Sequence, residues 1–512
     1  MAGSNQGIPH YRVIIIGAGF AGLGMAIRLR QAGETDFVVF EKESGVGGTW
    51  WVNSYPGCAC DVESHLYAFS FAPNPDWRRL FAPAREIRDY LQRCAERFGV
   101  MPHVRLNTGI RRMDWDDSAG LWHLLDAGGA RYTANVVVAG MGALSVPHYP
   151  DIPGLERFRG RVFHSQQWDH EHVLDNRRVA VIGTGASAVQ FVPRIRPKVR
   201  HLDLYQRTPP WIVPRPDRAV SHRERRRLRR FPGLQLAWRW GLYWLLEARV
   251  LAFARYPGLM RLLQRSAERH LREQVPDPRL RRALTPDYMF GCKRILLSDD
   301  FYPAVTAENV DLITAGIREV REDAIVTLDG IERPADTIIL GTGFRAADPV
   351  PTGMIFGRHG VDLGEHWADG PQAYKGTTIA GFPNLFMLMG PNTGLGHSSV
   401  VLMIESQIAY VMDALRRMHR GGIGAVDVKP DVQQAWNRWL QRRLQGTVWN
   451  VGGCRSWYLH PVSGRNVTLW PGFTWQFRLR TRRFDLGAYR TRPVDADTSA
   501  TVGRVAVPGK EW

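Results

Sequence analysis

The stretch Arg12-Val-Ile-Ile-Ile-Gly17-Ala-Gly19-Phe-Ala-Gly22 decides the fold of this chain of 512 residues. Its apolar run is typical of a buried parallel strand, because both faces of such a strand are covered. The glycines fit a turn that binds a dinucleotide: Gly17 for the tight turn, Gly19 for backbone approach to a pyrophosphate, and Gly22 for helix packing. The helix that follows presents its first N–H groups to the phosphates.

The same arrangement occurs a second time. Arg178-Val-Ala-Val-Ile182 runs into Gly183-Thr-Gly185-Ala-Ser187-Ala188, where alanine is an accepted variant of the last glycine. Further apolar runs follow each turn after a helical pattern, at Phe37-Val-Val-Phe40 and Asp203-Leu-Tyr205. This repeated βαβ pattern predicts an α/β fold with two dinucleotide-binding Rossmann-like domains.

One residue after each second strand distinguishes the two sites. Glu41 lies 24 residues after Gly17, and Arg207 lies 24 residues after Gly183. A carboxylate accepts hydrogen bonds from ribose hydroxyls, whereas a guanidinium attracts a 2′-phosphate. We therefore expect FAD at the first site and NADPH, with Arg207 and Thr208 at its phosphate, at the second. The alternative is that Arg207 is a surface cation in an Arg-rich chain.

The predicted domains are discontinuous. We expect an FAD-binding domain over 10–146 and 336–490, and an NADP-binding domain over 154–213 and 287–335, joined by a Pro-rich linker at 147–153. A strand is predicted at 336–340 and a long helix at 398–418. The Arg-, Trp- and Leu-rich segment 214–286 reads as a helical insertion in the second domain. The polar segment 491–512 reads as a poorly ordered tail.

The net charge of +18 leaves several partners open: nucleic acid, an anionic membrane surface or anionic ligands. The run Arg223–Arg230 is better explained as a solvated basic helix face, and because no nucleic-acid-binding signature accompanies it we expect no nucleic-acid partner. The apolar stretch 234–253 contains Arg239, Glu247 and Arg249, which favours an interfacial or lid helix with weak membrane-surface contact over a spanning helix.

The cysteines and the N-terminal residues argue against a disulfide-rich, a zinc-binding and a secreted protein. Five cysteines do not make a disulfide framework in a chain of this length, and no zinc-type cluster is present, so no metal is expected. We expect Cys58, Cys60, Cys292 and Cys454 to be structural. The first ten residues lack an apolar signal segment, which predicts a cytoplasmic protein.

Two longer motifs carry a family resemblance. Phe158-Arg-Gly160-Arg-Val-Phe-His164-Ser-Gln-Gln-Trp168-Asp169 resembles the signature of Baeyer–Villiger monooxygenases, and Gly47-Gly48-Thr49-Trp50 through Asp61 resembles their second fingerprint. Cys292-Lys293-Arg294 is similar to the segment with the active-site arginine. Further similarity lies in Gly341–Phe344, in Gly390-Pro-Asn392 and in the segment 456–472, which resembles the subgroup that acts on aryl or linear ketones. The resemblance covers residues 10–490.

The resemblance implies an enzyme that uses FAD, NADPH and O2 to convert small ketones to esters or lactones through a C4a-peroxyflavin, with sulfide oxidation as a side reaction. Arg294 would keep the peroxide anionic, Asp61 would position Arg294, and His164 would act in the linker as the domains move. The implied cofactor-binding residues are Gly17, Gly19, Gly22, Glu41, Gly48, Thr49, Trp50, Asp61, Gly183, Gly185, Ser187, Arg207, Thr208, Lys293 and Asn392.

Alternatives remain for these residues and for the activity. His164 fits a hydrogen-bonded histidine without proton chemistry, Asp61 a helix cap, and Arg294 a surface ion pair with Asp299 or Asp300. The nearest alternative function is an N- or S-oxygenating flavin monooxygenase. A pyridine nucleotide–disulfide reductase needs a CxxC pair that the chain lacks, and a non-catalytic flavin-binding scaffold is the remaining class.

Overall fold

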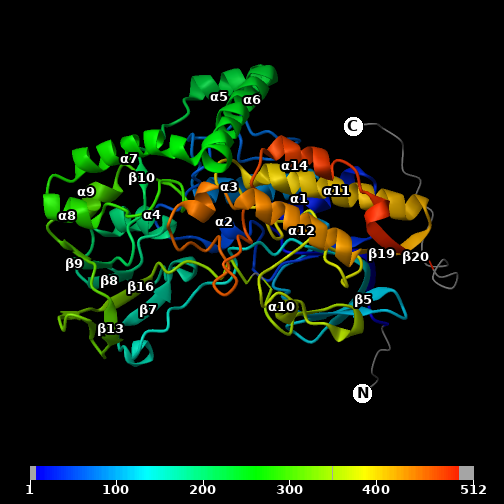
Figure 1. Cartoon of the computed structure of the whole chain (residues 1–512), viewed down its shortest axis with the longest axis horizontal. Coiled ribbons are helices and arrows are strands. Elements are labelled where there is room, and N and C mark those ends of the chain that lie inside the picture. The colour runs from blue at the N-terminus through cyan, green and yellow to red at the C-terminus, as the bar shows by residue number, and fades with distance from the viewer. Residues whose placement is uncertain (1–6, 349, 495–512) are drawn as a thin grey trace.

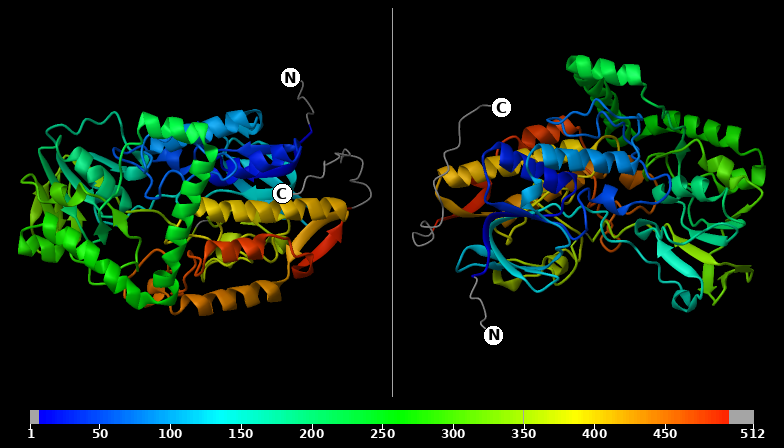
Figure 2. Two further views of the ribbon diagram at one scale, coloured as in Figure 1. Left: turned by 90° about the horizontal axis from the view of Figure 1, so that it is seen from above. Right: turned by 180° about the vertical axis from the view of Figure 1, so that it is seen from behind.

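The computed structural model describes residues 7–348 and 350–494 and arranges them as two α/β units (Figures 1 and 2). The sheet of the first unit has eight strands, in the order β17-β4-β5-β6-β1-β2-β3, with β18 also paired to β6. Its strands are β1 (His10–Ile16), β2 (Phe37–Phe40), β3 (Val104–Arg105), β4 (Ile110–Asp116), β5 (Leu121–Asp126), β6 (Arg131–Ala139), β17 (Ile355–Phe356) and β18 (Leu385–Met387).

The second unit is built on a five-stranded sheet in the order β12-β9-β8-β16-β7. Its strands are parallel throughout: β7 (Arg161–His164), β8 (Arg178–Ile182), β9 (His201–Tyr205), β12 (Val310–Ile313) and β16 (Thr337–Leu340). In each unit a strand leads through a glycine turn into a helix, α1 (Phe20–Gln31) or α4 (Ala186–Ile195). The predicted fold class, two Rossmann-like units in an α/β protein, is confirmed.

The predicted boundary at residue 336 is wrong. Strand β16 lies between β8 and β7, with Thr337 opposite both Val179 and Arg161. All four residues of β16 are buried, and the ladder bonds of a central strand tie them to the second sheet. The chain therefore returns to the first unit only after Leu340.

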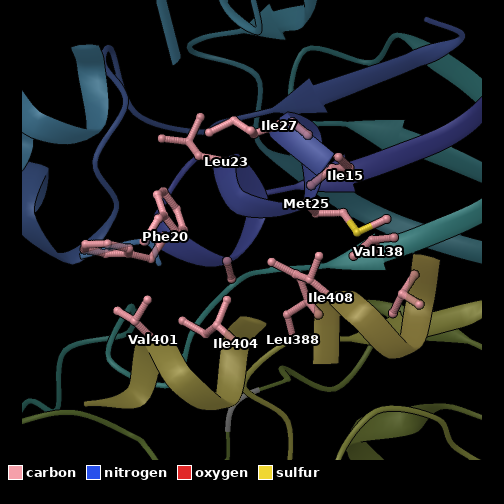
Figure 3. Packing of buried hydrophobic residues seen from close by; sticks show 14 of the residues in the cluster. Ile15, Phe20, Leu23, Met25, Ile27, Val138, Leu388, Val401, Ile404 and Ile408 are labelled. Carbon is pink, nitrogen blue, oxygen red and sulfur yellow. The ribbon is translucent and has the colours of Figure 1, made fainter. Parts of the chain in front are cut away.

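The core of the first unit joins distant parts of the sequence. Helix α1 packs on the predicted long helix, which is observed as α11 (Val400–Arg420). Figure 3 shows Ile404 and Ile408 of α11 facing α1. A Cβ atom at Gly24 would lie 2.9 Å from the end of the Ile408 side chain, so this glycine lets the two helices approach closely.

The predicted helical insertion is present and contacts both units. It comprises α5 (His222–Arg230), α6 (Pro232–Ala248), the π-helix η4 (Leu251–Arg255), α7 (Met260–Gln274) and α8 (Pro278–Ala283). Leu242 and Tyr243 of α6 belong to the core of the first unit, whereas Leu271 of α7 belongs to the core of the second. Among the described helices, none is both long and apolar enough to cross a membrane.

The predicted tail begins too early. Residues 491–493 belong to β20 (Tyr489–Pro493), which pairs antiparallel with β19 (Ile423–Val428). Pairing fixes these polar residues because their backbone groups complete the two-stranded sheet. The rest of the predicted tail, 495–512, lies outside the described residues.

The remaining elements cover the sheets or connect them. They are α2 (Thr49–Val52), α3 (Ala84–Arg97), α9 (Phe301–Val305), α10 (Leu363–His366), α12 (Pro430–Leu444), α13 (Val448–Val451), α14 (Thr474–Thr481), β10 (Ile212–Val213), β11 (Leu296–Leu297), β13 (Ile317–Val320), β14 (Ala324–Thr327) and β15 (Glu332–Pro334).

Candidate active site

The first glycine turn has the shape that a pyrophosphate requires. Gly17 has φ +94°, a conformation that disfavours residues with a side chain, and a Cβ atom at Gly22 would lie 1.8 Å from the carbonyl oxygen of Gly17. Gly19 caps α1 without a side-chain hydrogen bond. The first N–H groups of α1 are therefore not capped by Gly19 and suit an anion.

Glu41 lies beside this turn at the end of β2. Its carboxylate accepts hydrogen bonds from the backbone N–H groups of Ala18 (2.6 Å) and Glu43 (3.0 Å). Burial raises the pKa of Glu41 above its ordinary value, and these two hydrogen bonds oppose the rise. The carboxylate is thus fixed next to the glycine turn, where a ribose of the first dinucleotide would lie.

The second glycine turn repeats this geometry. Gly183 has φ +109°, and Gly185 caps α4 without a side-chain hydrogen bond. The hydroxyl of Thr184 donates to the carbonyl oxygen of Thr208 (3.3 Å), which holds the end of β9 against the turn. Ser187, the second residue of α4, lies close enough to Tyr55 of the first unit to oppose in part the rise that burial causes in the pKa of Tyr55.

Two cations converge beside the second turn. Burial lowers the pKa of Lys293, and the nearby charge of Arg207 lowers it further. The ammonium group of Lys293 lies 4.8 Å from the centre of the Tyr288 ring, and Arg207 is exposed. The charge of Asp287 raises the pKa of Lys293 and opposes this shift in part, but neither cation forms an ion pair with another described residue. Two such neighbouring cations favour an anion such as a phosphate.

The segment 47–61 joins the two units. A Cβ atom at Gly48 would lie 2.9 Å from the Cα atom of Gly19, so this glycine closes over the first turn. Tyr55 donates its hydroxyl to Gln190 of α4 (3.0 Å), and Gln190 donates to the carbonyl oxygen of Ala59 (2.9 Å). Trp50 donates to the Tyr67 hydroxyl (3.2 Å), and Thr49 begins α2.

Asp61 and Arg294 form a bidentate ion pair at this junction. The Arg294 Nε donates to one carboxylate oxygen (2.5 Å) and a terminal nitrogen to the other (2.6 Å). Burial opposes ionisation of Asp61, but the charge and hydrogen bonds of Arg294 outweigh it and lower the pKa of Asp61. The charge of Asp61 in turn raises the pKa of Arg294. Both groups therefore stay charged at neutral pH.

The predicted alternatives for this pair are not observed. Asp299 instead accepts from the backbone N–H of Arg215 (3.0 Å), and Asp300 pairs with Arg194 (2.7 Å). Asp61 is not the N-cap of any described helix, and both of its carboxylate oxygens accept from Arg294. The second terminal nitrogen of Arg294 lies 3.5 Å from the carbonyl oxygen of Leu395, shortly before α11. Arg294 thus links the second unit, to which it belongs, with Asp61 and with the chain just before α11.

The segment 454–469, which we call the C-terminal segment, also lies near Arg294. Tyr458 is 2% exposed, and burial raises the pKa of its hydroxyl to about 12 although the charge of Arg294 opposes the rise. A disulfide between Cys292 and Cys454 ties this segment to the chain just before Arg294. This pairing could not be predicted from the sequence, since 162 residues separate the two cysteines and neither shows a local signal.

His164 lies at the end of β7, where the chain crosses between the units. It is fully buried; its Nδ1 accepts from the Gln166 N–H (3.1 Å), which leaves Nε2–H to donate to the Gly343 carbonyl oxygen (3.1 Å). Burial lowers the pKa of His164, so the ring stays neutral at pH 7. The other crossing segment is held there too, because His148 N–H donates to the same Gly343 carbonyl (2.8 Å).

Asn392 has a structural role in addition to any contact with a cofactor. Its side-chain nitrogen donates to the carbonyl oxygens of Asn466 (2.8 Å) and Leu469 (3.2 Å). These bonds fasten the C-terminal segment, in which Tyr458 also lies. Near them, the buried hydroxyl of Ser398 at the start of α11 has no hydrogen-bond partner among the described residues, as expected of a group that faces a ligand.

A cavity of about 760 Å³ opens beside segment 47–61. Its lining includes Trp50, Tyr55, Gln190 and Arg215, but neither glycine turn and not Arg294. The cavity therefore lies at the junction of the units and apart from the predicted cofactor turns.

Comparison with known proteins shows which proteins this chain resembles. A family model described as flavin-binding monooxygenase-like matches residues 10–224. A Baeyer–Villiger monooxygenase of Pseudomonas aeruginosa is 61% identical over 502 residues, which are 97% of this chain and 95% of that protein. Two solved structures cover 95% of this chain and all of their own. Cyclohexanone monooxygenase from Rhodococcus sp. Phi1 bound to NADP+ is 26% identical, with a TM-score of 0.83. The OTEMO complex with FAD and NADP is 25% identical, with a TM-score of 0.85.

The fold, the two glycine turns and these similarities define the class: the chain is a flavin monooxygenase and thus an oxidoreductase. Within this class it belongs to the Baeyer–Villiger monooxygenases. The family resemblance predicted from the fingerprints at 47–61 and 158–169 is confirmed.

Proposed function

We propose that this Baeyer–Villiger monooxygenase uses FAD and NADPH to insert one oxygen atom of O2 beside the carbonyl group of small ketones, giving esters or lactones. The observation that carries the proposal is the bidentate pair of Asp61 and Arg294, held where the two dinucleotide units meet. Bound NADPH supplies a hydride and bound FAD supplies oxygen activation; the protein supplies position and charge.

Arg294 provides the permanent cation that this chemistry needs. An anionic oxygen is a much stronger nucleophile toward a carbonyl carbon than its protonated form, and a guanidinium beside it stabilises that charge without a proton transfer. Asp61 acts as a positioning residue, because its two hydrogen bonds fix the plane of the guanidinium. One terminal nitrogen then remains directed toward the start of α11.

The cofactor sites follow from the two turns. Gly17, Gly19 and Glu41, with Gly22, Gly48, Thr49, Trp50 and Asn392 around them, would hold FAD through uncapped helix N–H groups and a fixed carboxylate. Gly183, Gly185, Ser187 and Thr208 would hold NADPH, with Arg207 and Lys293 at its 2′-phosphate.

Water must be excluded from the reacting oxygen, and the C-terminal segment suits this task. Tyr458 is buried beside Arg294, and the segment is anchored by the Cys292–Cys454 disulfide and by the Asn392 hydrogen bonds. His164 would couple the crossing segments as the units move, and its neutral ring does so through one hydrogen bond to Gly343.

The experiment is a substrate panel with product analysis on the FAD-loaded protein. Cyclic, linear and aryl ketones are compared with a thioether under 18O2, and NADPH use is measured with each. We expect NADPH oxidation to rise with a ketone and one 18O atom to appear in the ester or lactone. Oxidation of the thioether with no ester from any ketone would show an S-oxygenating enzyme and overturn the proposal.

A further inference from the structure

Helix α6 has its charges on the inner side and its apolar residues outside. Its two charged residues, Arg239 and Glu247, are directed into the protein. Arg239 donates to the carbonyl oxygens of His65 (2.9 Å) and Ala68 (3.1 Å). Glu247 is 1% exposed and accepts from the Thr474 backbone (2.9 Å) and hydroxyl (2.8 Å). These contacts fix the rotation of α6 and leave its other face to solvent.

The outer face of α6 carries large apolar side chains. Leu234, Leu236, Trp240, Trp244 and Leu245 are each between 47% and 58% exposed, and we call them the apolar face of α6. The exposed positions between them are small, and a Cβ atom at Gly241 would meet nothing within 4 Å. Such a patch is uncommon on a protein surface and marks a binding surface.

The apolar face adjoins a strongly basic helix. Four exposed arginines of α5 form no ion pair with any described residue, and we call them the α5 arginines: Arg223, Arg226, Arg227 and Arg230. Two acids beside these helices are paired with other arginines, Asp76 with Arg229 (2.6 Å) and Glu224 with Arg218 (2.8 Å). The two helices project together from one side of the molecule in Figure 1 and in the right view of Figure 2.

We propose that α5 and α6 dock this enzyme on an anionic lipid surface. The apolar face of α6 would lie at the boundary of headgroups and acyl chains, and the α5 arginines would contact acidic headgroups. A helix of 17 residues spans about 25 Å, so α6 suits lying in the surface rather than crossing it.

Charge favours lipid over the other occupants of this surface. Two copies of the chain related by a twofold axis would bring two Arg-rich helices together, and like charges repel. Nucleic acid would pair with the α5 arginines but would leave Trp244 and its apolar neighbours without a partner. An anionic membrane offers acyl chains to the apolar face of α6 and acidic headgroups to the α5 arginines.

The test is binding of the FAD-loaded protein to vesicles at about 0.15 M salt, where exposed charges are screened beyond roughly 8 Å. Vesicles of phosphatidylcholine alone are compared with vesicles that contain about one-third phosphatidylglycerol. We expect binding to the anionic vesicles to be at least about tenfold stronger. The double substitution Trp240→Ser/Trp244→Ser and the double substitution Arg226→Gln/Arg230→Gln should each weaken it about tenfold.

Two controls keep the outcome specific. Leu328→Ser/Ile331→Ser removes exposed apolar side chains around the turn between β14 and β15, away from α6, and should leave vesicle binding unchanged. All three variants should keep the wild-type rate of NADPH oxidation with a ketone in solution, since none of these residues lies in the proposed cofactor sites.

Several results would overturn the proposal. Equal binding to both vesicle types, or no binding to either, would remove the lipid surface as partner. A change from dimer to monomer in the tryptophan variant, without vesicle binding by the wild type, would assign the face to a second copy. Retention on DNA at the same salt without vesicle binding would assign the α5 arginines to nucleic acid.

Discussion

Glu41 and Arg207 hold equivalent positions after the two glycine turns, yet they differ in burial and in the groups around them. Glu41 is buried and bound by two backbone N–H groups. Arg207 is exposed, and its charge acts on Lys293. A fixed acceptor suits ribose hydroxyls, and a pair of cations suits a phosphate.

The cation pair predicts how the enzyme distinguishes NADPH from NADH. Arg207→Ala and Lys293→Ala should each raise the KM for NADPH about 10- to 100-fold, because a hydrogen bond to a charged group contributes about 1.5–3 kcal/mol. The KM for NADH should change less than about threefold. Steady-state kinetics with both coenzymes measure this, with Arg200→Ala, an exposed arginine of the same unit, as control. Equal rises for the two coenzymes would exclude a phosphate contact.

The spacing from the glycine turns was sufficient to predict the positions of Glu41 and Arg207, but no such spacing predicts that Asp61 pairs with Arg294. Glu41 and Arg207 follow strands that the apolar pattern reveals, so their positions can be predicted. Asp61 and Arg294 are separated by 233 residues, and only the family resemblance connected them. Residues near in sequence, such as Asp299, are equally plausible partners until the backbone is known, and the structure gives Asp299 another hydrogen bond.

At the scale of elements, apolar runs that end in glycine predicted the parallel strands well. They assigned the last strand of the second sheet to the wrong unit, because β16 is inserted between strands that precede it by more than 150 residues. The polar end of β20 was also missed, since its pairing with β19 depends on backbone groups and not on side chains.

The disulfide predicts a measurable change in stability. Replacing Cys454 with Ser should lower the free energy of unfolding by about 2–5 kcal/mol, because the bond restricts a long loop of the unfolded chain. Guanidinium unfolding with and without reductant measures this. Thiol titration of the denatured protein checks the bond itself: three free thiols, Cys58, Cys60 and Cys94, are expected before reduction and five after it. Five thiols before reduction would contradict the disulfide.

The contact of α6 with the first unit predicts a dependence of stability on pH. Burial and the charge of Arg239 lower the pKa of His65 to about 4 in the folded protein, against 6.5 when exposed. The unfolded chain therefore takes up this proton first, and stability falls as pH drops from about 6.5 to about 4. The loss reaches up to about 3 kcal/mol.

A matched variant isolates this contribution. In His65→Gln the side chain does not titrate, so the free energy of unfolding should fall less over the same pH range. Urea unfolding of both proteins at several pH values compares them. Identical pH profiles for the two proteins would show that His65 does not contribute.

At the scale of the whole molecule, the ion pair of Asp61 and Arg294 joins the two units. Asp61 comes from the segment that closes over the first glycine turn, and Arg294 comes from the chain that returns through the second unit. Tyr55, Gln190 and His164 hold the same junction by hydrogen bonds. A motion of one unit against the other thus acts directly on the position of the guanidinium.

The most direct test of this account is the amount of ester formed per NADPH consumed in FAD-loaded Arg294→Ala, with Arg294→Lys beside it. We predict that Arg294→Ala still binds FAD and oxidises NADPH, that ester formation falls at least about 100-fold, and that hydrogen peroxide accounts for the consumed NADPH. Arg294→Lys, which keeps the charge but not the paired donors, should lie between the two. Ester formation by Arg294→Ala at close to the wild-type ratio would contradict the central role of this cation.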